Sequence, residues 1–163
     1  MIKTNLYSIN AKYIQLSDID NNKLFEESSQ TWHKRLHYDN TQSMYEDTEF
    51  NYEGVESKKL IDKIQNATGM SVYNIWTHKH EHNESTQIHN HWAKEHDFSF
   101  VYYVRVPDNA GKIVFQLNKH CNQSWFEPKE SMLYVFPNWL DHYVTKNLSN
   151  EIRLSISGNL TTR

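Results

Sequence analysis

The run of short strand-like segments that follows Gly69 constrains the fold of this chain more than any other feature. These segments are rich in β-branched and aromatic residues and are separated by turn signals, a pattern typical of an antiparallel β-sandwich or barrel. A turn is expected over Pro107–Gly111, because proline fixes φ and glycine tolerates positive φ, and we expect a hairpin there. The expected strands are Ser71–Thr77, Gln87–His91, Phe98–Val106, Lys112–Leu117, Met132–Phe136, Trp139–Thr145 and Ile152–Ser157.

The segment before Gly69 carries apolar residues at helical spacing instead. Asp20–His37 and Glu56–Asn66 predict two amphipathic helices, and the second should stop at Gly69. An extended pattern over Asn5–Leu16 predicts a first strand at a sheet edge. The acidic and polar segment Asp39–Gly54 predicts a solvated connector between the helices.

The length of the chain, 163 residues, is that of one domain. We therefore expect a single domain over residues 1–163, in which 1–70 supply a strand and helical support and 71–160 form the β core. Only 37% of the residues are hydrophobic, but 7 Phe, 5 Trp and 10 Tyr supply large buried areas. Trp92, Trp125 and Trp139 are accordingly expected mainly to pack in the core.

Charge and cysteine content exclude several classes of protein. The formal charge is -3 and no basic stripe is evident, so nucleic acid is not an expected partner. The one cysteine, Cys121, lies in an expected loop and cannot form a disulfide framework or a cysteine zinc finger, which favours a reducing compartment. No apolar run can span a membrane and no secretion signal begins the chain, so we predict a cytoplasmic protein. Sheet edges leave a homodimer open.

The chain has 10 histidines, and their spacing separates them into groups. His78, His80 and His82 alternate within a polar stretch, which we interpret as a solvent-facing strand end or loop rather than as ligands. His89 and His91 lie in an extended segment and point to the same face, so both imidazoles can meet one metal ion. His142, at the start of a later strand, is a third candidate ligand.

A polar strand face follows near the C-terminus. Period two places Arg153, Ser155 and Ser157 on one face and Leu154 and Ile156 on the other. If the polar face lines a pocket, an arginine with serines would form a receptor for a carboxylate.

Five motifs occur in order over about residues 70–160. They are His-x-His at 89–91, an aromatic strand at 101–104, Pro-x-x-x-Gly-x-x-x-Phe at 107–115, Phe-Pro-x-x-Leu-x-His at 136–142 and Arg-x-Ser-x-Ser-x-Asn at 153–159. Together they resemble the 2-oxoglutarate and Fe(II)-dependent oxygenases, and more narrowly a small bacterial and phage branch of that superfamily. The first 70 residues match it only loosely.

This resemblance implies a mainly β fold with N-terminal helices, a double-stranded β-helix or jelly roll with the metal inside one mouth. It implies a non-haem dioxygenase that uses Fe(II), 2-oxoglutarate as cosubstrate and O2 to hydroxylate a substrate. His89 and His142 would bind iron, Arg153 would pair with the distal carboxylate of 2-oxoglutarate, and Ser155 would donate a hydrogen bond to it. Tyr103, or its neighbour Tyr102, would add a further hydrogen bond. The substrate, a small molecule or a protein side chain, is not readable from the sequence.

One position departs from the family pattern. Two residues after the first histidine the superfamily usually has Asp or Glu, and this chain has His91. His91 can be a third neutral ligand, which we favour because the strand geometry aims it at the metal. Alternatively Glu95 or Asp97 supplies the carboxylate from the following turn, or His91 is a bystander.

Two other functions compete for the same residues. His89-x-His91-x-x-x-Glu95 followed by Pro137-x-x-x-x-His142 resembles the cupin motifs, which would give a metal-dependent enzyme without 2-oxoglutarate. The expected cupin glycines are missing and Arg153 would have no task, so this hypothesis ranks second. A non-catalytic β-sandwich that binds a ligand on exposed tryptophans is the third.

Overall fold

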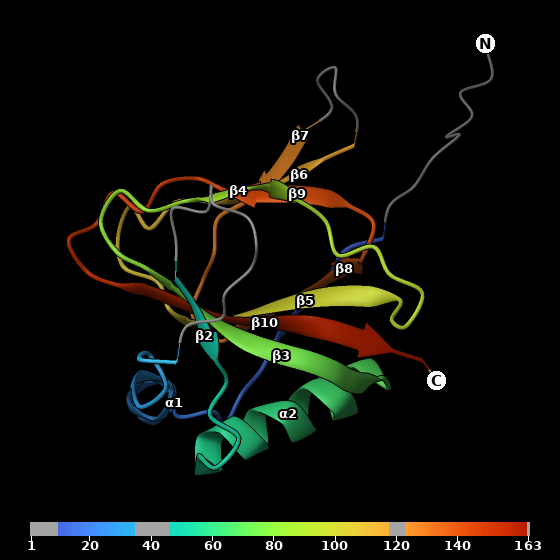
Figure 1. Ribbon diagram of the computed structural model, residues 1–163, viewed down its shortest axis with the longest axis horizontal. Helices are drawn as coiled ribbons and strands as arrows, with labels where there is room; N and C mark the ends of the chain where they lie inside the picture. The colour runs from blue at the N-terminus through green and yellow to red at the C-terminus, as the bar shows by residue number, and fades with distance from the viewer. Residues whose placement is uncertain (1–9, 35–45, 118–122, 163) are drawn as a thin grey trace.

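The computed structural model describes residues 10–34, 46–117 and 123–162 (Figure 1). Twelve elements follow one another along the described chain: β1 (Lys12–Gln15), α1 (Asn21–Ser29), β2 (Glu46–Glu49), α2 (Val55–Thr68), β3 (Ser71–His80), β4 (Thr86–His89), β5 (Phe98–Arg105), β6 (Ile113–Gln116), β7 (Gln123–Phe126), β8 (Met132–Pro137), β9 (Asp141–Val144) and β10 (Arg153–Thr161).

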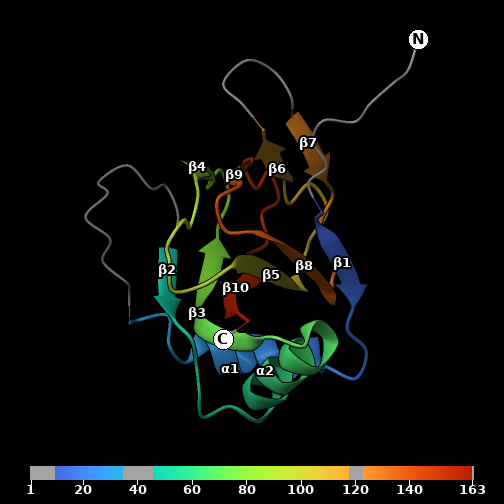
Figure 2. The ribbon, with the colours of Figure 1, turned by 90° about the vertical axis from the view of Figure 1, so that its right-hand side faces the viewer.

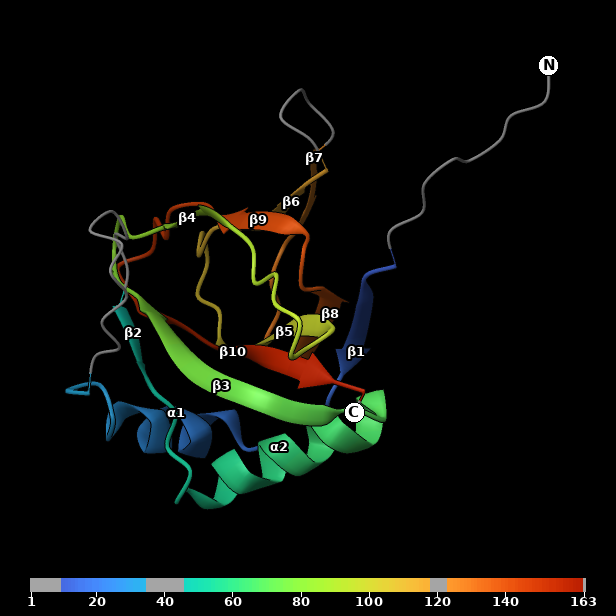
Figure 3. The same ribbon diagram turned by 45° about the vertical axis from the view of Figure 1, so that its right-hand side comes forward.

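Two antiparallel sheets and two helices form three layers. The larger sheet has the order β1-β8-β5-β10-β3-β2 and the smaller sheet the order β4-β9-β6-β7. Figure 2 and Figure 3 show both helices against the outer face of the larger sheet, with the smaller sheet on its other side. This arrangement confirms the predicted jelly roll with N-terminal helices.

The alternation of side chains along β10 explains why a cavity lies between the sheets. Leu154, Ile156 and Leu160 point to the helix side, where they are buried in one hydrophobic cluster with Leu60 and Ile64 of α2. The intervening residues of β10 therefore point between the two sheets, as predicted. Polar side chains on that face are available to a ligand, while the apolar face holds the helices in place.

Local signals account for both helices. Asp20 caps α1, because its Oδ1 accepts hydrogen bonds from the backbone N–H groups of Asn22 and Lys23, each 3.1 Å away. α2 ends at Gly69, which has the left-handed φ of 71°. The second predicted helix is confirmed. The first is shorter than predicted: it ends at Ser29, and residues 35–37 of the prediction lie outside the described chain.

The predicted connector Asp39–Gly54 is wrong in its second half. Glu46–Glu49 forms strand β2, which pairs with β3, and Phe50 is buried. The acidic composition concealed this strand, whose Asp47 and Thr48 are nevertheless both buried. Residues 39–45 lie outside the described chain, as do residues 5–9 of the predicted first strand and Cys121. The described part of that strand, β1, does lie at a sheet edge.

The turn at Pro107–Gly111 forms, but the predicted hairpin is wrong. The backbone N–H of Ala110 donates to Pro107 O at 3.2 Å, and Gly111 has a φ of 83°. The turn leads from β5 in the larger sheet to β6 in the smaller one, because both neighbours of β5 are already β8 and β10. It thus brings the Ala110 carbonyl to the guanidinium of Arg153, which lines the cavity.

Other strand predictions hold with changed bounds. β3 extends to His80 and β10 to Thr161, both beyond the predicted ends, and β7 was not predicted. The packing role expected for three tryptophans is wrong: Trp92, Trp125 and Trp139 are exposed by 67%, 60% and 49%. Within the described ranges, no helix combines the length and apolarity needed to cross a bilayer.

Candidate functional site

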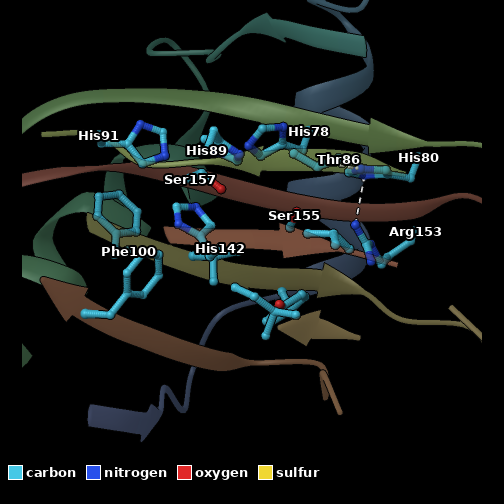
Figure 4. Close-up of a pocket in the computed structure, with 15 residues that line it drawn as sticks. His78, His80, Thr86, His89, His91, Phe100, His142, Arg153, Ser155 and Ser157 are labelled. Atoms are coloured by element: carbon cyan, nitrogen blue, oxygen red, sulfur yellow. Dashed lines mark hydrogen bonds between the residues drawn. The ribbon is translucent and has the colours of Figure 1, made fainter. Parts of the chain in front are cut away.

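Three histidines meet in the cavity between the sheets. His89 on β4 and His142 on β9 are direct partners across the ladder of the smaller sheet. His91 follows β4 and is fixed by its backbone N–H, which donates to Asn138 O at 2.8 Å. One ring nitrogen from each of these residues, the histidine cluster, lies within 4.8 Å of the others. Figure 4 shows the three rings turned toward one another. The sequence prediction that these residues come together is confirmed.

Hydrogen bonds leave one nitrogen of two cluster members free for a ligand. Nδ1 of His89 lies 2.8 Å from Gln87 O, and Nδ1 of His142 lies 2.9 Å from Leu140 O. A carbonyl oxygen only accepts, so each Nδ1 carries the proton and each Nε2 presents its lone pair. This is the tautomer of a metal-ligating histidine, whose second ring nitrogen is held by a carbonyl.

Burial also keeps the histidine cluster in its neutral form. It lowers the pKa of His91 to about 2, with His142 as the next cause, and that of His142 to about 3, with His89 as the next cause. The pKa of His89 is lowered as well, mainly by burial. Three neutral imidazoles at converging distances suit a divalent transition metal, since a proton does not compete for the lone pairs at neutral pH.

The two carboxylates considered as alternative ligands lie elsewhere. Glu95 is exposed and does not belong to the histidine cluster. Oδ2 of Asp97 accepts hydrogen bonds from the backbone N–H and the hydroxyl of Thr162, at 3.1 and 2.8 Å. Geometry therefore favours His91 as the third ligand.

Arg153 lies in the same cavity as the histidine cluster, and only 1% of its surface is exposed. Its Nη1 donates to Ala110 O at 3.1 Å and its Nη2 to Nδ1 of His80 at 3.0 Å, while its Nε–H has no partner. Burial lowers the pKa of Arg153 to about 10, so the guanidinium stays charged at neutral pH. Among the residues that the structure describes, no carboxylate forms an ion pair with it.

The other two predicted cosubstrate residues lie beside Arg153. Ser155 of β10 and Tyr103 of β5 are register partners, both are buried, and both line the cavity. Burial raises the pKa of Tyr103, so its phenol keeps its proton. Tyr102, the alternative to Tyr103, points the other way: its hydroxyl donates to Asn21 Oδ1 at 2.8 Å on the helix side.

The interpretation of the alternating histidines as a solvent-facing stretch is wrong for two of them. His78 and His80 belong to β3, are buried by more than nine-tenths, and line the cavity beside β10. Only His82 is exposed, with Nδ1 3.0 Å from Ser149 O. Their period-two spacing was the available signal, because it places both on one sheet face. That face is the one of Ser155 and Arg153, their register partners on β10. Neither His78 nor His80 belongs to the histidine cluster.

His80 holds Arg153 in place. The guanidinium of arginine can only donate, so Nδ1 of His80 accepts from it and the ring proton is on Nε2. Nε2 lies 2.8 Å from Thr86 Oγ1, to which it donates. Burial is the main cause that lowers the pKa of His80 well below its ordinary value, and the Arg153 charge is the next. Sequence reasoning missed both His80 and Thr86 as cavity residues.

The buried neutral histidines predict a pH-dependent stability of the metal-free protein. His80, His91 and His142 bind no proton when folded, whereas in the unfolded chain each takes one up near pH 6.5. Below pH 6.5 the unfolded state therefore binds more protons than the folded state. As the pH is lowered further, the free energy of unfolding falls by about 1.4 kcal/mol per pH unit for each of these histidines. Denaturant unfolding in the presence of a chelator, at pH 7.5 and at pH 5.5, measures this loss of stability. A His142→Gln variant should show a shallower slope, and a wild-type stability that does not fall would contradict this account.

Comparison with known proteins agrees with the site. A family model described as "Putative 2OG-Fe(II) oxygenase" matches residues 74–159, which include all three cluster histidines and Arg153. No curated protein matches the chain significantly. Many solved structures do.

Three of these structures illustrate the likeness in fold. A prolyl-4-hydroxylase from Pseudomonas putida is 14% identical with a TM-score of 0.69, over 96% of this chain and 94% of that one. A viral collagen prolyl hydroxylase from Paramecium Bursaria Chlorella virus-1, in complex with 2OG, is 15% identical with a TM-score of 0.65, over 92% and 94%. A prolyl hydroxylase from Trichoplax adhaerens, bound to a peptide of hypoxia inducible factor, is 11% identical with a TM-score of 0.71, over 93% and 83%.

Identities this low establish the jelly-roll fold alone, whereas the family model covers more than half of the chain. The cupin and binding-module hypotheses therefore give way to the oxygenase hypothesis. The chain belongs to the 2OG-Fe(II) oxygenase family, whose members are oxidoreductases that use Fe(II) and 2-oxoglutarate.

Proposed function

We propose that His89, His91 and His142 bind Fe(II) and that Arg153, Ser155 and Tyr103 bind 2-oxoglutarate, so that the enzyme oxidises a small molecule or a peptide side chain. The observation that carries this proposal is the buried, charged Arg153 without a carboxylate partner in the cavity of the histidine cluster. A buried charge is costly unless it is paired. A ligand carboxylate supplies that pair.

The hydrogen bonds of Arg153 support a carboxylate as its ligand. Two of the five guanidinium N–H groups are used within the protein, by Ala110 O and His80, and the rest, Nε–H included, remain for a ligand. The planar fork of a guanidinium suits a carboxylate in two-point contact. Ser155 and Tyr103, on the same sheet face, have hydroxyls that donate to the same group.

The residues that line the cavity suit a dicarboxylate with a 2-oxo group. Its lining residues include Arg153 and the histidine cluster together, so a ligand held by Arg153 at one carboxylate directs its other end to the metal (Figure 4). When bound, Fe(II) and 2-oxoglutarate supply the oxidising chemistry, with release of succinate and CO2 as O2 is consumed. Apolar walls formed by Val101, Ile113 and Phe136 keep water from that space.

The substrate would enter beside His91. Trp92 directly follows His91 in the chain, and Trp139 follows Asn138, whose carbonyl accepts the hydrogen bond from His91. Both indoles are exposed, so they offer apolar area on the surface at positions next in the chain to these two residues. A small molecule or peptide with an apolar portion would pack against these indoles.

His91→Asp should convert the site to the usual two-histidine, one-carboxylate triad. We expect this variant to bind Fe(II) or Co(II) at least as tightly as the wild type, because a carboxylate adds Coulomb attraction at the same position. His91→Ala removes the third ligand and should lower the affinity by about tenfold or more. Anaerobic titration with Co(II), followed by absorption, measures both. Equal affinities of wild type and His91→Ala would show that His91 is not a ligand.

A further inference from the structure

A buried carboxylate lies on the β3 side of the cavity, and the proposed function does not use it. Asp47 of β2 and His78 of β3 are register partners, and Oδ1 of Asp47 contacts Nδ1 of His78. Their side chains are only 5% and 11% exposed. A carboxylate is rarely buried this deeply unless it is paired, so this contact calls for a structural or functional reason.

Hydrogen bonding fixes the tautomer of His78. Nε1–H of Trp76 donates to Nε2 of His78 at 2.8 Å. An indole N–H is a donor only, so Nε2 carries no proton and His78 is a neutral imidazole with its proton on Nδ1, toward Asp47. With Asp47 ionised, the Asp47–His78 pair carries one negative charge. Both nitrogens of His78 are engaged, which agrees with its absence from the histidine cluster.

The charged pair lies against the histidine cluster. The ring of Trp76 lies 5.4 Å from the ring of His91, centroid to centroid. His78 and His89 line the same cavity, and the Asp47 charge opposes the lowering of the His89 pKa that burial causes. Figure 4 shows His78 next to His89 in the cavity. A negative charge at Asp47 thus lies among buried groups beside the cluster, where Coulomb interactions are stronger than in water.

The usual facial triad neutralises part of the metal charge with its carboxylate, and the histidine cluster has none. We propose that Asp47, held by His78, supplies from outside the coordination sphere the negative charge that a triad carboxylate would supply directly. This inference rests on the proposed function only in that the histidine cluster binds the divalent metal. In the part of the chain that the structure describes, His78 accepts from Trp76 and contacts Asp47, so the effect that we propose for Asp47 is one of charge.

The first test measures metal affinity without cosubstrate or turnover. Asp47→Asn keeps the shape of the side chain and removes the charge, and should weaken Co(II) binding by about 10- to 100-fold. Asp47→Glu keeps the charge and should stay within about threefold of the wild type. Asp97→Asn is the matched control, because this carboxylate contacts Thr162 instead, and it should leave the affinity unchanged. An unchanged affinity in Asp47→Asn would overturn the proposal.

The second test separates charge from structural support through a double-mutant cycle with His91→Asp. In the His91→Asp background the new carboxylate lies within the triad and makes the charge of Asp47 redundant, so adding Asp47→Asn to it should cost no more than about threefold. A merely structural role predicts the same loss in both backgrounds, and that additive result would refute a charge role. Thermal unfolding identifies variants that fold, and Asp47→Ser replaces Asp47→Asn if the latter does not fold.

Failure of the proposed function gives a different signature from failure of this inference. If the histidine cluster is not the metal site, the wild type and His142→Ala bind Co(II) equally, whatever residue 47 is. If the cluster binds the metal and 2-oxoglutarate has no effect, the cosubstrate assignment fails while the cycle at Asp47 still reports on metal charge.

Discussion

Arg153→Ala should abolish measurable 2-oxoglutarate binding while the protein keeps its metal. The guanidinium is the one buried cation on the described cavity lining, and its loss removes a two-point, charge-assisted contact with the distal carboxylate. Removing one partner of a buried charged pair costs about 3 kcal/mol, which corresponds to an affinity loss of more than 100-fold. Anaerobic calorimetry of 2-oxoglutarate binding to Mn(II)-loaded protein measures it.

Two comparisons guard this result against misfolding. Arg105→Ala is the matched control, because Arg105 lies over the Phe25 ring at 3.7 Å on the helix side and lines no part of the cavity. It should bind 2-oxoglutarate as the wild type does. Arg153→Lys keeps the charge and loses the fork, and we expect an intermediate affinity. Unaltered 2-oxoglutarate binding by a folded Arg153→Ala protein would refute the assignment of the carboxylate site.

His142→Ala should lose the metal, and with it every metal-dependent property. His142 is the most buried member of the histidine cluster, and its Nε2 is directed by the Nδ1 contact to Leu140 O. Removal of one of three ligands should lower the Fe(II) or Co(II) affinity by about 100-fold or more, beyond the 10- to 100-fold range typical of residues that only support a ligand. Metal content after gel filtration, together with Co(II) titration, measures it.

The control for this variant is another histidine of the same chain. His82 is exposed, lies on the turn after β3 and is outside the histidine cluster, so His82→Ala should retain full metal content. If His82→Ala lost the metal as His142→Ala does, or if His142→Ala retained it, the histidine cluster would not be the metal site.

The sequence was sufficient for the face-by-face arrangement of the strands that hold the site. Period two along β10 places Arg153 and Ser155 away from Leu154, and the His-x-His spacing brings His89 and His91 together. These are local rules that need no knowledge of neighbouring strands. The resemblance to the oxygenase family supplied the roles, which local rules alone do not give.

The residues that sequence reasoning misjudged depend on long-range pairing. His78 and His80 sit in a polar stretch, and only their register against β10 and the cover of β2 make them buried. Asp47 likewise lies in an acidic segment whose pairing with β3 leaves no local trace. The Pro107–Gly111 turn has the residues of a hairpin turn, yet β5 already has partners on both edges.

A cytoplasmic location, a homodimer and the lack of a nucleic-acid partner stay predictions.

An anaerobic titration shows whether this cavity holds Fe(II) and 2-oxoglutarate together. Fe(II) is added to the metal-free protein, and 2-oxoglutarate is then titrated while the visible charge-transfer absorption of a chelated 2-oxo acid is followed. The account predicts a saturable band in the wild type that is missing in Arg153→Ala at the same concentrations. Bound metal without a band at any concentration of 2-oxoglutarate would contradict it.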